Sequence, residues 1–290
     1  MKKALLYLFA FICIQYFVSW AVFAVWLLAA GHSSSDVLAV LNGQKLELIT
    51  APMQILSCAV YSALTLALFV WRKWAVLSPA YLRSGKWGIF FWSGIASLGT
   101  LLPSVWLQSL MPDLANTSEE TFRQLMSSQY GYFVLCLLVP FVEETVFRGA
   151  ILKSLLGSFS RPWVAILISA AVFAVIHLNP AQMPHAFLIG LLLGWMYYRT
   201  GSILPGVAVH WVNNTVVYVL CTLFPHIASM SSLDGLFGGN QKSVVLSLIF
   251  SMFIFLPAIY QLNMRMKNVK KTDNFRTFNA LRMAMPAAKP

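Results

Sequence analysis

Charged residues are scarce in this chain of 290 residues. Lys and Arg number 20 and Asp and Glu only 9, so charged residues make up 10% of the sequence, against about 25% in an ordinary soluble domain. Apolar types (AVILMFWYC) make up 59%, and the mean hydropathy is +0.73. A soluble protein of this size cannot cover that much apolar surface with so few charges. These figures exclude a soluble globular protein, and the scarcity of Gly, Pro and charge excludes collagen-like, disordered and coiled-coil chains.

Cysteine is rare as well, and the patterns of other classes are missing. Each of the four cysteines lies alone within an apolar stretch, without the paired spacing of a zinc ribbon or a redox motif: Cys13, Cys58, Cys136 and Cys221. We interpret them as small apolar residues in helix packing. The alternating ten-residue strands of a membrane barrel are also missing, which leaves helices as the way to cross a bilayer.

Largely apolar stretches recur along the chain at about the length needed to cross some 30 Å of hydrocarbon, roughly 20 residues. We predict an all-α, polytopic membrane protein of about eight transmembrane helices. The fifth and sixth stretches are short, and the linker 179–182 between them would also suit one re-entrant hairpin. The predicted spans are 4–30, 51–71, 87–111, 130–152, 163–178, 183–198, 202–223 and 243–262.

In this topology the positively charged residues are distributed very unequally between the two sides of the membrane. With the N-terminus in the cytoplasm and the sides alternating, 17 of the 20 Lys and Arg residues fall on the cytoplasmic side, and only Lys45, Arg123 and Lys242 fall outside. This bias predicts a multi-pass protein of the cell (inner) membrane with both termini in the cytoplasm. The first uncharged run, 4–30, is too long for the apolar core of a signal peptide, so we interpret it as an anchor.

The net charge of +11 is therefore mostly a topology signal, and we predict no nucleic-acid partner. We divide the chain into N-terminal helices 1–3 with an outer loop (1–129), a core of helices 4–7 (130–223), an outer loop with helix 8 (224–262) and a basic cytoplasmic tail (263–290). The tail is expected to lie near anionic headgroups, so the lipid bilayer is a predicted partner.

Two of the nine acids, Glu143 and Glu144, are adjacent inside a predicted span. Ionisable residues inside spans are costly and by default indicate functional sites. On a helix Glu144 can pair with Arg148, four residues on, whereas Glu143 points about 100° away. We predict a structural ion pair of Glu144 with Arg148 and a lone Glu143 carboxylate free to take a proton. The simpler interpretation is that both acids mark the cytoplasmic end of a helix.

Two histidines and an asparagine add polar groups to other spans. His177 ends the fifth span, and His210 and Asn214 share a face of the seventh. Polar side chains of different membrane helices need one another for solvation, so we expect one intramembrane polar cavity shared with Glu143. The three other histidines lie near predicted helix ends or loops and are interpreted as interfacial: His32, His185 and His226.

A carboxylate, two imidazoles and an amide fit the hydrolysis of an amide bond. Glu143 would activate a water with help from His177, and His210 and Asn214 would stabilise the developing oxyanion. In a second version Glu143, His177 and His210 hold a metal that acidifies the water. The His-Glu-x-x-His signature of zinc proteases is absent, so spacing alone establishes no metal. A Ser or Cys nucleophile is disfavoured because none lies in a recognisable elbow or beside a base.

The motifs that carry these residues resemble those of a known family, the CPBP intramembrane proteases. This family includes the type II CAAX prenyl endopeptidase and bacterial bacteriocin-processing and immunity proteins. The matching segments are EETVFRG from Glu143 to Gly149, FAVIH ending at His177, and HWVNN beginning at His210. The resemblance covers 130–223 and implies an eight-helix fold with a membrane-embedded site open to the cytosol. By motif position it implies Glu143 as general base, Glu144 as partner of Arg148, His177 as water-orienting residue, and His210 with Asn214 as the oxyanion site.

The first motif continues as Phe-Arg-Gly, which resembles the sequences of the bacterial branch of the family. For this branch the resemblance does not imply a prenylated substrate. We predict an intramembrane endopeptidase that acts on a membrane-associated peptide or protein, with a metal-free glutamate mechanism favoured and zinc left open as a cofactor. One alternative is a non-catalytic membrane immunity or chaperone protein. A second is a proton-coupled transporter that uses Glu143 and the histidines as a relay, although the chain shows no internal repeat.

Overall fold

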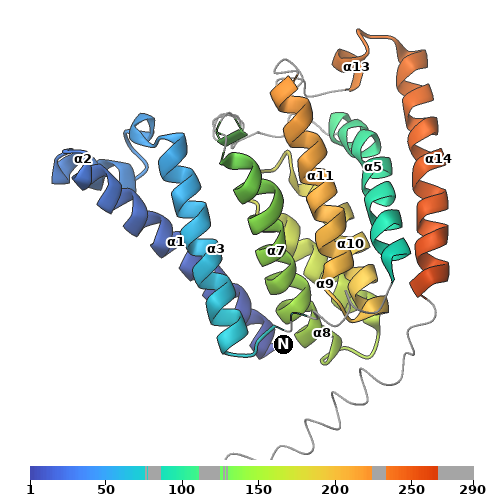
Figure 1. Cartoon of the computed structure of the whole chain (residues 1–290), viewed down its shortest axis with the longest axis horizontal. Helices are drawn as coiled ribbons and strands as arrows, with labels where there is room; N and C mark the ends of the chain where they lie inside the picture. The colour runs from blue at the N-terminus through green and yellow to red at the C-terminus, as the bar shows by residue number, and fades with distance from the viewer. Residues whose placement is uncertain are drawn as a thin grey trace, which may run out of the picture.

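A computed structural model of the protein describes residues 1–75, 77, 86–110, 125–126, 128, 130–223 and 233–266. In this described part of the chain every regular element is a helix. One edge of the bundle is formed by α1 (Lys2–Ala29) and α3 (Ala51–Trp71), and the opposite edge by α5 (Trp87–Ser109) and α14 (Gln241–Met266) (Figure 1). The start of α1 and the end of α14 lie at the same end of the bundle.

The middle of the bundle contains the segments that bear the predicted site. A helical run comprises η2 (Phe133–Leu138), α7 (Val139–Glu144), η3 (Thr145–Leu152) and α8 (Lys153–Leu156), of which η2 and η3 are π-helical. It is followed by α9 (Pro162–Val175), α10 (Met183–Thr200) and α11 (Leu204–Leu223). Helix α10 packs against α9, and α11 packs against α5, η2 and α7. The short elements are α2 (Ser34–Leu41), η1 (Leu46–Leu48) and α13 (Leu233–Leu236).

Proline and glycine set several of the helix boundaries. Pro52, Pro162 and Pro184 lie at the first or second position of α3, α9 and α10, where the missing N–H has no intrahelical partner to lose. Helix α10 ends at Gly201, whose φ of 66° places it in the left-handed region that glycine adopts without a steric penalty.

The long helices expose apolar surface, as helices surrounded by lipid do. Only 6% of the most apolar stretch of α1 and 17% of that of α14 is buried inside the protein. An exposed apolar area of this extent indicates contact with a membrane and not with water. The prediction of an all-α, multi-pass membrane protein is confirmed.

Each of the eight predicted spans coincides with a helix or helical run in the described residues, yet length and hydropathy support five crossings. These five are α1, α3, α5, α11 and α14. The other three are the mixed run 131–156, the 14-residue α9, and α10, which carries His185 and Arg199. Polar residues and short length lower the membrane signal of these three, so the number eight stays a prediction. The predictions made for His226, for 111–124 of the outer loop, and for the tail beyond Met266 lie outside the described residues.

The ionised form of Asp36 holds the start of α2 together. The Asp36 N–H donates to Ser33 Oγ and the Ser33 N–H donates to Asp36 Oδ2, each at 3.2 Å, and Lys45 Nζ donates to Asp36 Oδ1 at 2.5 Å. The bonds from Lys45 and then Ser33 lower the pKa of Asp36 from 3.8 to about 2. Because the folded-state pKa is lowered, this contribution is complete above about pH 4 and is lost as the pH falls toward 2.

We therefore expect the amides of α2 to lose protection against hydrogen exchange between about pH 4 and pH 2. Exchange measured by mass spectrometry, corrected for intrinsic rates, checks this. In Asp36→Asn the protection should be lower throughout and should not change across that window. An equal pH-dependent loss in Asp36→Asn would assign the effect to another group.

Candidate active site

Glu143 and Glu144 end α7, a short α-helical stretch between the π-helical segments η2 and η3. A π-helix pairs each carbonyl with the N–H five residues on, and such segments are frequent at functional sites. The π-helical partner of the Leu135 carbonyl is residue 140, and Pro140 has no N–H to donate. This carbonyl is therefore available to a donor from another helix.

Asn214 of α11 supplies that donor. Its Nδ2 atom donates to the Leu135 carbonyl at 2.9 Å. Because a carbonyl only accepts, Asn214 must direct its NH₂ group at Leu135 and its Oδ1 atom elsewhere. Asn213 Nδ2 donates to that Oδ1 at 3.2 Å. One bond thus fixes the orientation of both amides and leaves Asn214 a second N–H for another acceptor.

Glu144 and Arg148 form a fully buried ion pair. Arg148 Nη1 donates to Glu144 Oε1 at 2.7 Å, and both residues have 0% exposure. Arg148 Nη2 also donates to the Gly190 carbonyl of α10 at 3.2 Å, and its guanidinium lies 4.4 Å from the ring centroid of Phe173 of α9. Arg148 therefore links α9 and α10 to the run that carries Glu144, and its positive charge compensates that carboxylate.

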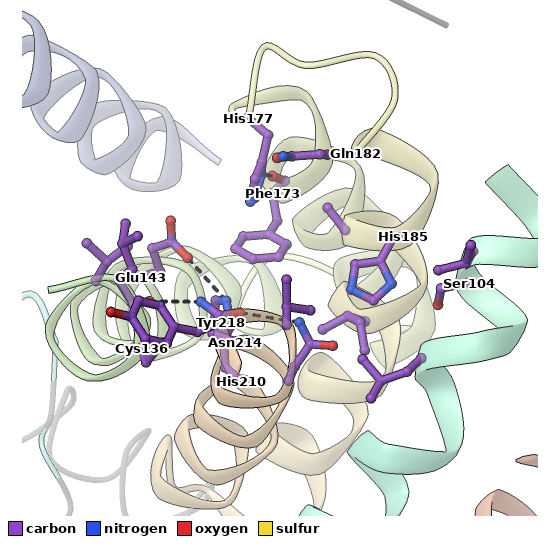
Figure 2. A pocket seen from close by; sticks show the side chains of 18 of the residues that line it. Ser104, Cys136, Glu143, Phe173, His177, Gln182, His185, His210, Asn214 and Tyr218 are labelled. Carbon is purple, nitrogen blue, oxygen red and sulfur yellow. Dashed lines mark hydrogen bonds and ion pairs between the residues drawn. The ribbon is translucent and has the colours of Figure 1, made fainter. Parts of the chain in front are cut away.

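Glu143 faces His210 of α11 instead (Figure 2). Glu143 Oε2 lies 3.6 Å from His210 Nε2, and Nδ1 of the same ring lies 3.8 Å from Glu144 Oε1. The Glu143 side chain is 16% exposed, and that of His210 is 9% exposed. The imidazole thus lies between two carboxylates. That of Glu144 is paired with Arg148, and that of Glu143 is open to the cavity described below.

His177 lies in the turn that follows α9. Its Nδ1 atom is 2.7 Å from the Phe173 carbonyl. Since the carbonyl only accepts, Nδ1 carries the hydrogen, and Nε2 of the neutral ring is left as an acceptor. The Phe173 ring packs edge-on against both imidazoles, with centroids 4.9 Å from His177 and 6.0 Å from His210.

One cavity of about 380 Å³ joins these groups (Figure 2). Its walls come from α5, η2, α7, α10, α11, and the end of α9 with the turn after it. The four predicted catalytic residues all line it: Glu143, His177, His210 and Asn214. Glu144 and Arg148 do not line it and lie buried behind its wall.

Further polar residues of the lining were not predicted for the site: Ser104, Gln108, Gln182, His185 and Asn213. His185 was interpreted as interfacial. It does lie at a helix end, in the first turn of α10, and its side chain lines the cavity. A usable signal was present for Asn213, which follows His210 by three residues on nearly the same helix face.

The predicted metal set does not converge in this arrangement. Among the described residues, no three His, Cys, Asp or Glu side chains lie close enough to share a metal ion. Glu143 and His210 face each other, but His177 does not join them in a group of three such side chains. These three residues as placed here do not fit the four-coordinate zinc site of a hydrolase.

Gly206, near the start of α11, lies directly against the buried ion pair. A Cβ atom there would lie 2.6 Å from Glu144 Oε2, and that carboxylate cannot move aside without weakening its bond to Arg148. We expect Gly206→Ala to lower the free energy of unfolding by about 1–3 kcal/mol, as overpacking typically does. Thermal unfolding in detergent measures the change.

Gly94→Ala is the matched control for this substitution. Among the described residues, a Cβ at Gly94 would meet only a Val212 methyl group, at an ordinary 3.5 Å. Since Ala favours a helix over Gly, this variant should unfold at the same temperature as the wild type or slightly above it. Equal destabilisation by both variants would show that contact with Glu144 is not the cause.

Comparison with known proteins agrees with the position of this site. Residues 127–216 match the family described as type II CAAX prenyl endopeptidase Rce1-like. The matched segment starts close to the predicted core (130–223) and contains all six residues of the predicted site. No curated protein and no solved structure matches the chain. Residues 127–216, which carry all six residues of the predicted site, are therefore similar to the type II CAAX prenyl endopeptidase Rce1-like family, a family of CAAX-type proteases.

Proposed function

We propose that this protein is an intramembrane endopeptidase that hydrolyses a peptide bond of a membrane-associated peptide or protein. The similarity of residues 127–216 to this family supports a CAAX-type protease in general terms. The main observation in support of this chemistry is that the two adjacent acids have different surroundings. Glu144 is compensated by Arg148, whereas Glu143 lines the cavity and faces His210 at 3.6 Å. Glu143 is thus the carboxylate available to accept a proton.

In the first step, Glu143 acts as general base. A water donates one hydrogen to Glu143 and the other to Nε2 of His177, which the Phe173 carbonyl leaves as an acceptor. Glu143 takes the proton as the water oxygen forms a bond to the carbonyl carbon. The carbonyl oxygen gains the electron pair and becomes the oxyanion of a tetrahedral intermediate.

His210 and Asn214 then stabilise this oxyanion. Asn214 keeps one N–H free of the Leu135 carbonyl, and the His210 ring lines the same cavity, so its Nε2 is the second donor when it carries the hydrogen. A donor of this kind typically contributes about 2.7–4 kcal/mol to the transition state. The intermediate collapses by re-forming the carbonyl and breaking the C–N bond, and Glu143 returns its proton to the leaving amine. One water is consumed, and a carboxylic acid and an amine are released; the acid then loses its proton to become a carboxylate.

We propose a cell (inner) membrane location with both termini in the cytoplasm. The distribution of 17 of 20 Lys and Arg residues supports this orientation, as does the shared end of the bundle at which α1 starts and α14 ends. In this proposal 130–223 form the catalytic core. The helices of 1–129 and 224–262 frame it, since α5 lines the cavity and α14 packs against α5.

Cleavage of synthetic peptides tests the proposal. The purified full chain in lipid nanodiscs is incubated with a library of single-span peptides in ¹⁸O-labelled water, and the products are identified by mass spectrometry. We expect a subset of peptides to be cut once, with ¹⁸O in the new carboxylate of each N-terminal fragment. Absence of fragments would contradict a hydrolase and favour a protein that works by binding, or a transporter if proton flux is found.

The same assay separates the two versions of the mechanism. We expect hydrolysis to survive exhaustive chelation in a preparation that contains no bound zinc. Loss of activity on chelation, with recovery on addition of zinc, would instead favour the metal-dependent version with ligands from Glu143, His177 and His210.

A further inference from the structure

The active-site cavity lies away from one end of the bundle. The start of α1 and the end of α14 mark that end, called the terminal end below, and α2 and α13 lie at the opposite end (Figure 1). Helix α5 starts at the terminal end, because its Gly88 lies against the guanidinium of Arg265 in the last turn of α14. The α5 residues that line the cavity begin only at Leu101, about 21 Å from the start of the helix at 1.5 Å per residue.

The other helices place their lining in the same direction. Helix α10 ends at the terminal end, where Arg199 Nη1 donates to Asn263 Oδ1 of α14 at 3.1 Å, and it lines the cavity only in its first half, up to Ile189. Helix α11 runs the opposite way and lines the cavity from His210, about 9 Å from its start, to Tyr218, about 21 Å from it. The cavity therefore extends away from the terminal end, with His210 near its floor.

Toward the terminal end the cavity is closed by packed side chains. Ser97 of α5 and Leu193 of α10 each lie one turn closer to the terminal end than the nearest lining residue of their helix, and both have 0% exposure. Ser97 Oγ donates at 2.9 Å to the carbonyl of Val209, which is also fully buried. Glu144, bonded to Arg148, lies with Leu193 against the start of α11. In the part of the chain that the structure describes, this packing leaves no passage for a peptide between the cavity and the terminal end.

Exposure increases in the other direction. Deep in the cavity, His210 and Asn213 are 7% and 8% exposed. Farther out, three polar lining residues are partly exposed: Gln108 near the end of α5, Tyr218 of α11, and Gln182 in the turn before α10. This gradient is expected of a cavity that water enters from the end opposite the terminal end.

We propose that the cavity is entered from the end of the bundle opposite the terminal end, and therefore from the extracytoplasmic side of the membrane. The second part rests on the proposed function and its orientation, in which both termini are cytoplasmic. The resemblance of the motifs implies a site open to the cytosol, whereas the position of the cavity favours access from the other side. The substrate is then a peptide segment that is exposed on the extracytoplasmic side, and segments confined to the cytoplasm are not cut.

Access from this side also suits the polar main chain of a peptide. A segment that enters past Gln108 and Gln182 meets amide groups able to donate and accept hydrogen bonds before it reaches Glu143. Such bonds offset the loss of water by the main chain of the peptide. From the terminal end the segment would first have to displace the buried side chains of Leu193 and Val209.

Thiol labelling tests the direction of access. The four native cysteines are first replaced by Ala, since Cys136 itself lines the cavity. Ser104→Cys then places one thiol in the cavity wall, and Arg265→Cys places one at the exposed terminal end. The full chain in right-side-out and inside-out membrane vesicles is treated with a membrane-impermeant maleimide, which needs a thiolate and so a thiol in contact with water. We expect Ser104→Cys to react in right-side-out vesicles and Arg265→Cys in inside-out vesicles.

Trp106→Cys is the matched control. Trp106 lies two residues from Ser104 on α5, but it is 38% exposed and is not part of the cavity wall that the structure describes. A thiol there should react in neither type of vesicle, because hydrocarbon disfavours the charged thiolate. The proposed entrance is overturned if Trp106→Cys reacts as fast as Ser104→Cys, if Ser104→Cys reacts from neither side, or if Ser104→Cys and Arg265→Cys react from the same side. If each reacts from the side opposite to that expected, the entrance stands and the extracytoplasmic substrate is overturned.

One-sided cleavage tests the substrate class and separates this inference from the proposed function. A peptide that the detergent-solubilised protein cuts is fused to a folded soluble domain, so that it cannot cross the membrane, and is added to each type of vesicle. Right-side-out vesicles should cut it at once, and inside-out vesicles only after detergent opens them; vesicles with Glu143→Gln correct for other proteases. Equal cleavage by intact inside-out vesicles would overturn extracytoplasmic access and leave the hydrolase standing. If no peptide is cut even in detergent, the hydrolase is overturned, and the labelling alone decides the entrance.

Discussion

Glu143→Gln is expected to lower the rate of peptide hydrolysis by about 10²–10⁴-fold, the contribution of a positioned general base. Gln has nearly the shape of Glu and can still accept a hydrogen bond, but it cannot take the proton of the attacking water. Since Glu143 lines the cavity and is 16% exposed, its charge is not part of the buried ion pair. Initial rates on a cleaved peptide and thermal unfolding in detergent are measured together, and the unfolding temperature should change little.

The adjacent acid provides the matched control. Glu144→Gln makes the same chemical change one residue away, but it removes the negative charge that compensates the buried guanidinium of Arg148. We expect Glu144→Gln to lower the unfolding temperature far more than Glu143→Gln does. A Glu143→Gln protein that cuts peptides at the wild-type rate would exclude Glu143 as the base.

Some of this arrangement follows from the sequence because it depends on rules within one helix. Uncharged runs such as those of α1 and α14 predict membrane helices by length alone. The spacing of Glu144 and Arg148 brings them together on any α-helical face, and the structure has that bond at 2.7 Å. The assignment of Glu143 to a different direction rests on the same geometry.

Contacts between helices could not be predicted in this way. The approach of Glu143 to His210 joins residues far apart in the sequence, and it depends on how α11 packs against α7. The π-helical segment before Pro140 needs Asn214 to satisfy the Leu135 carbonyl, so its register depends on tertiary structure. The position of His185 in the cavity wall could not be predicted for the same reason, because no local pattern says whether a helix end opens on a cavity.

Arg148→Met is expected to lower the free energy of unfolding by about 3–5 kcal/mol, which is the usual cost of leaving one member of a buried ion pair alone. The Glu144 carboxylate has 0% exposure and would lose its donor at 2.7 Å. Because Met fills a similar volume, the loss of stability reflects the missing charge more than an empty cavity. Arg199→Met is the control, because Arg199 is partly buried and bonds to Asn263 Oδ1 at 3.1 Å, and it has no carboxylate partner among the residues that the structure describes. This variant should lose less stability.

Arg148→Lys should also destabilise, although it keeps the positive charge. The guanidinium of Arg148 bonds to Glu144 and the Gly190 carbonyl while stacking on the Phe173 ring, and an ammonium group cannot make this planar, forked set of contacts. Unfolding temperatures in the order wild type, Lys, Met would support this account. A Lys variant as stable as the wild type would mean that charge alone is needed.

The double variant Glu144→Gln with Arg148→Met separates stability from catalysis. With no buried charge left, it should recover much of the stability lost in Arg148→Met, since removing both partners of a buried pair is far less costly than removing one. Hydrolysis should recover less than stability does, because Glu144 Oε1 also lies 3.8 Å from His210 Nδ1 and helps to orient the ring that faces Glu143. Unfolding temperature and initial rate, measured on the same preparations, distinguish the two effects. Full recovery of both would show that the ion pair supports the fold only, and recovery of stability alone would show that Glu144 also positions His210 for the reaction.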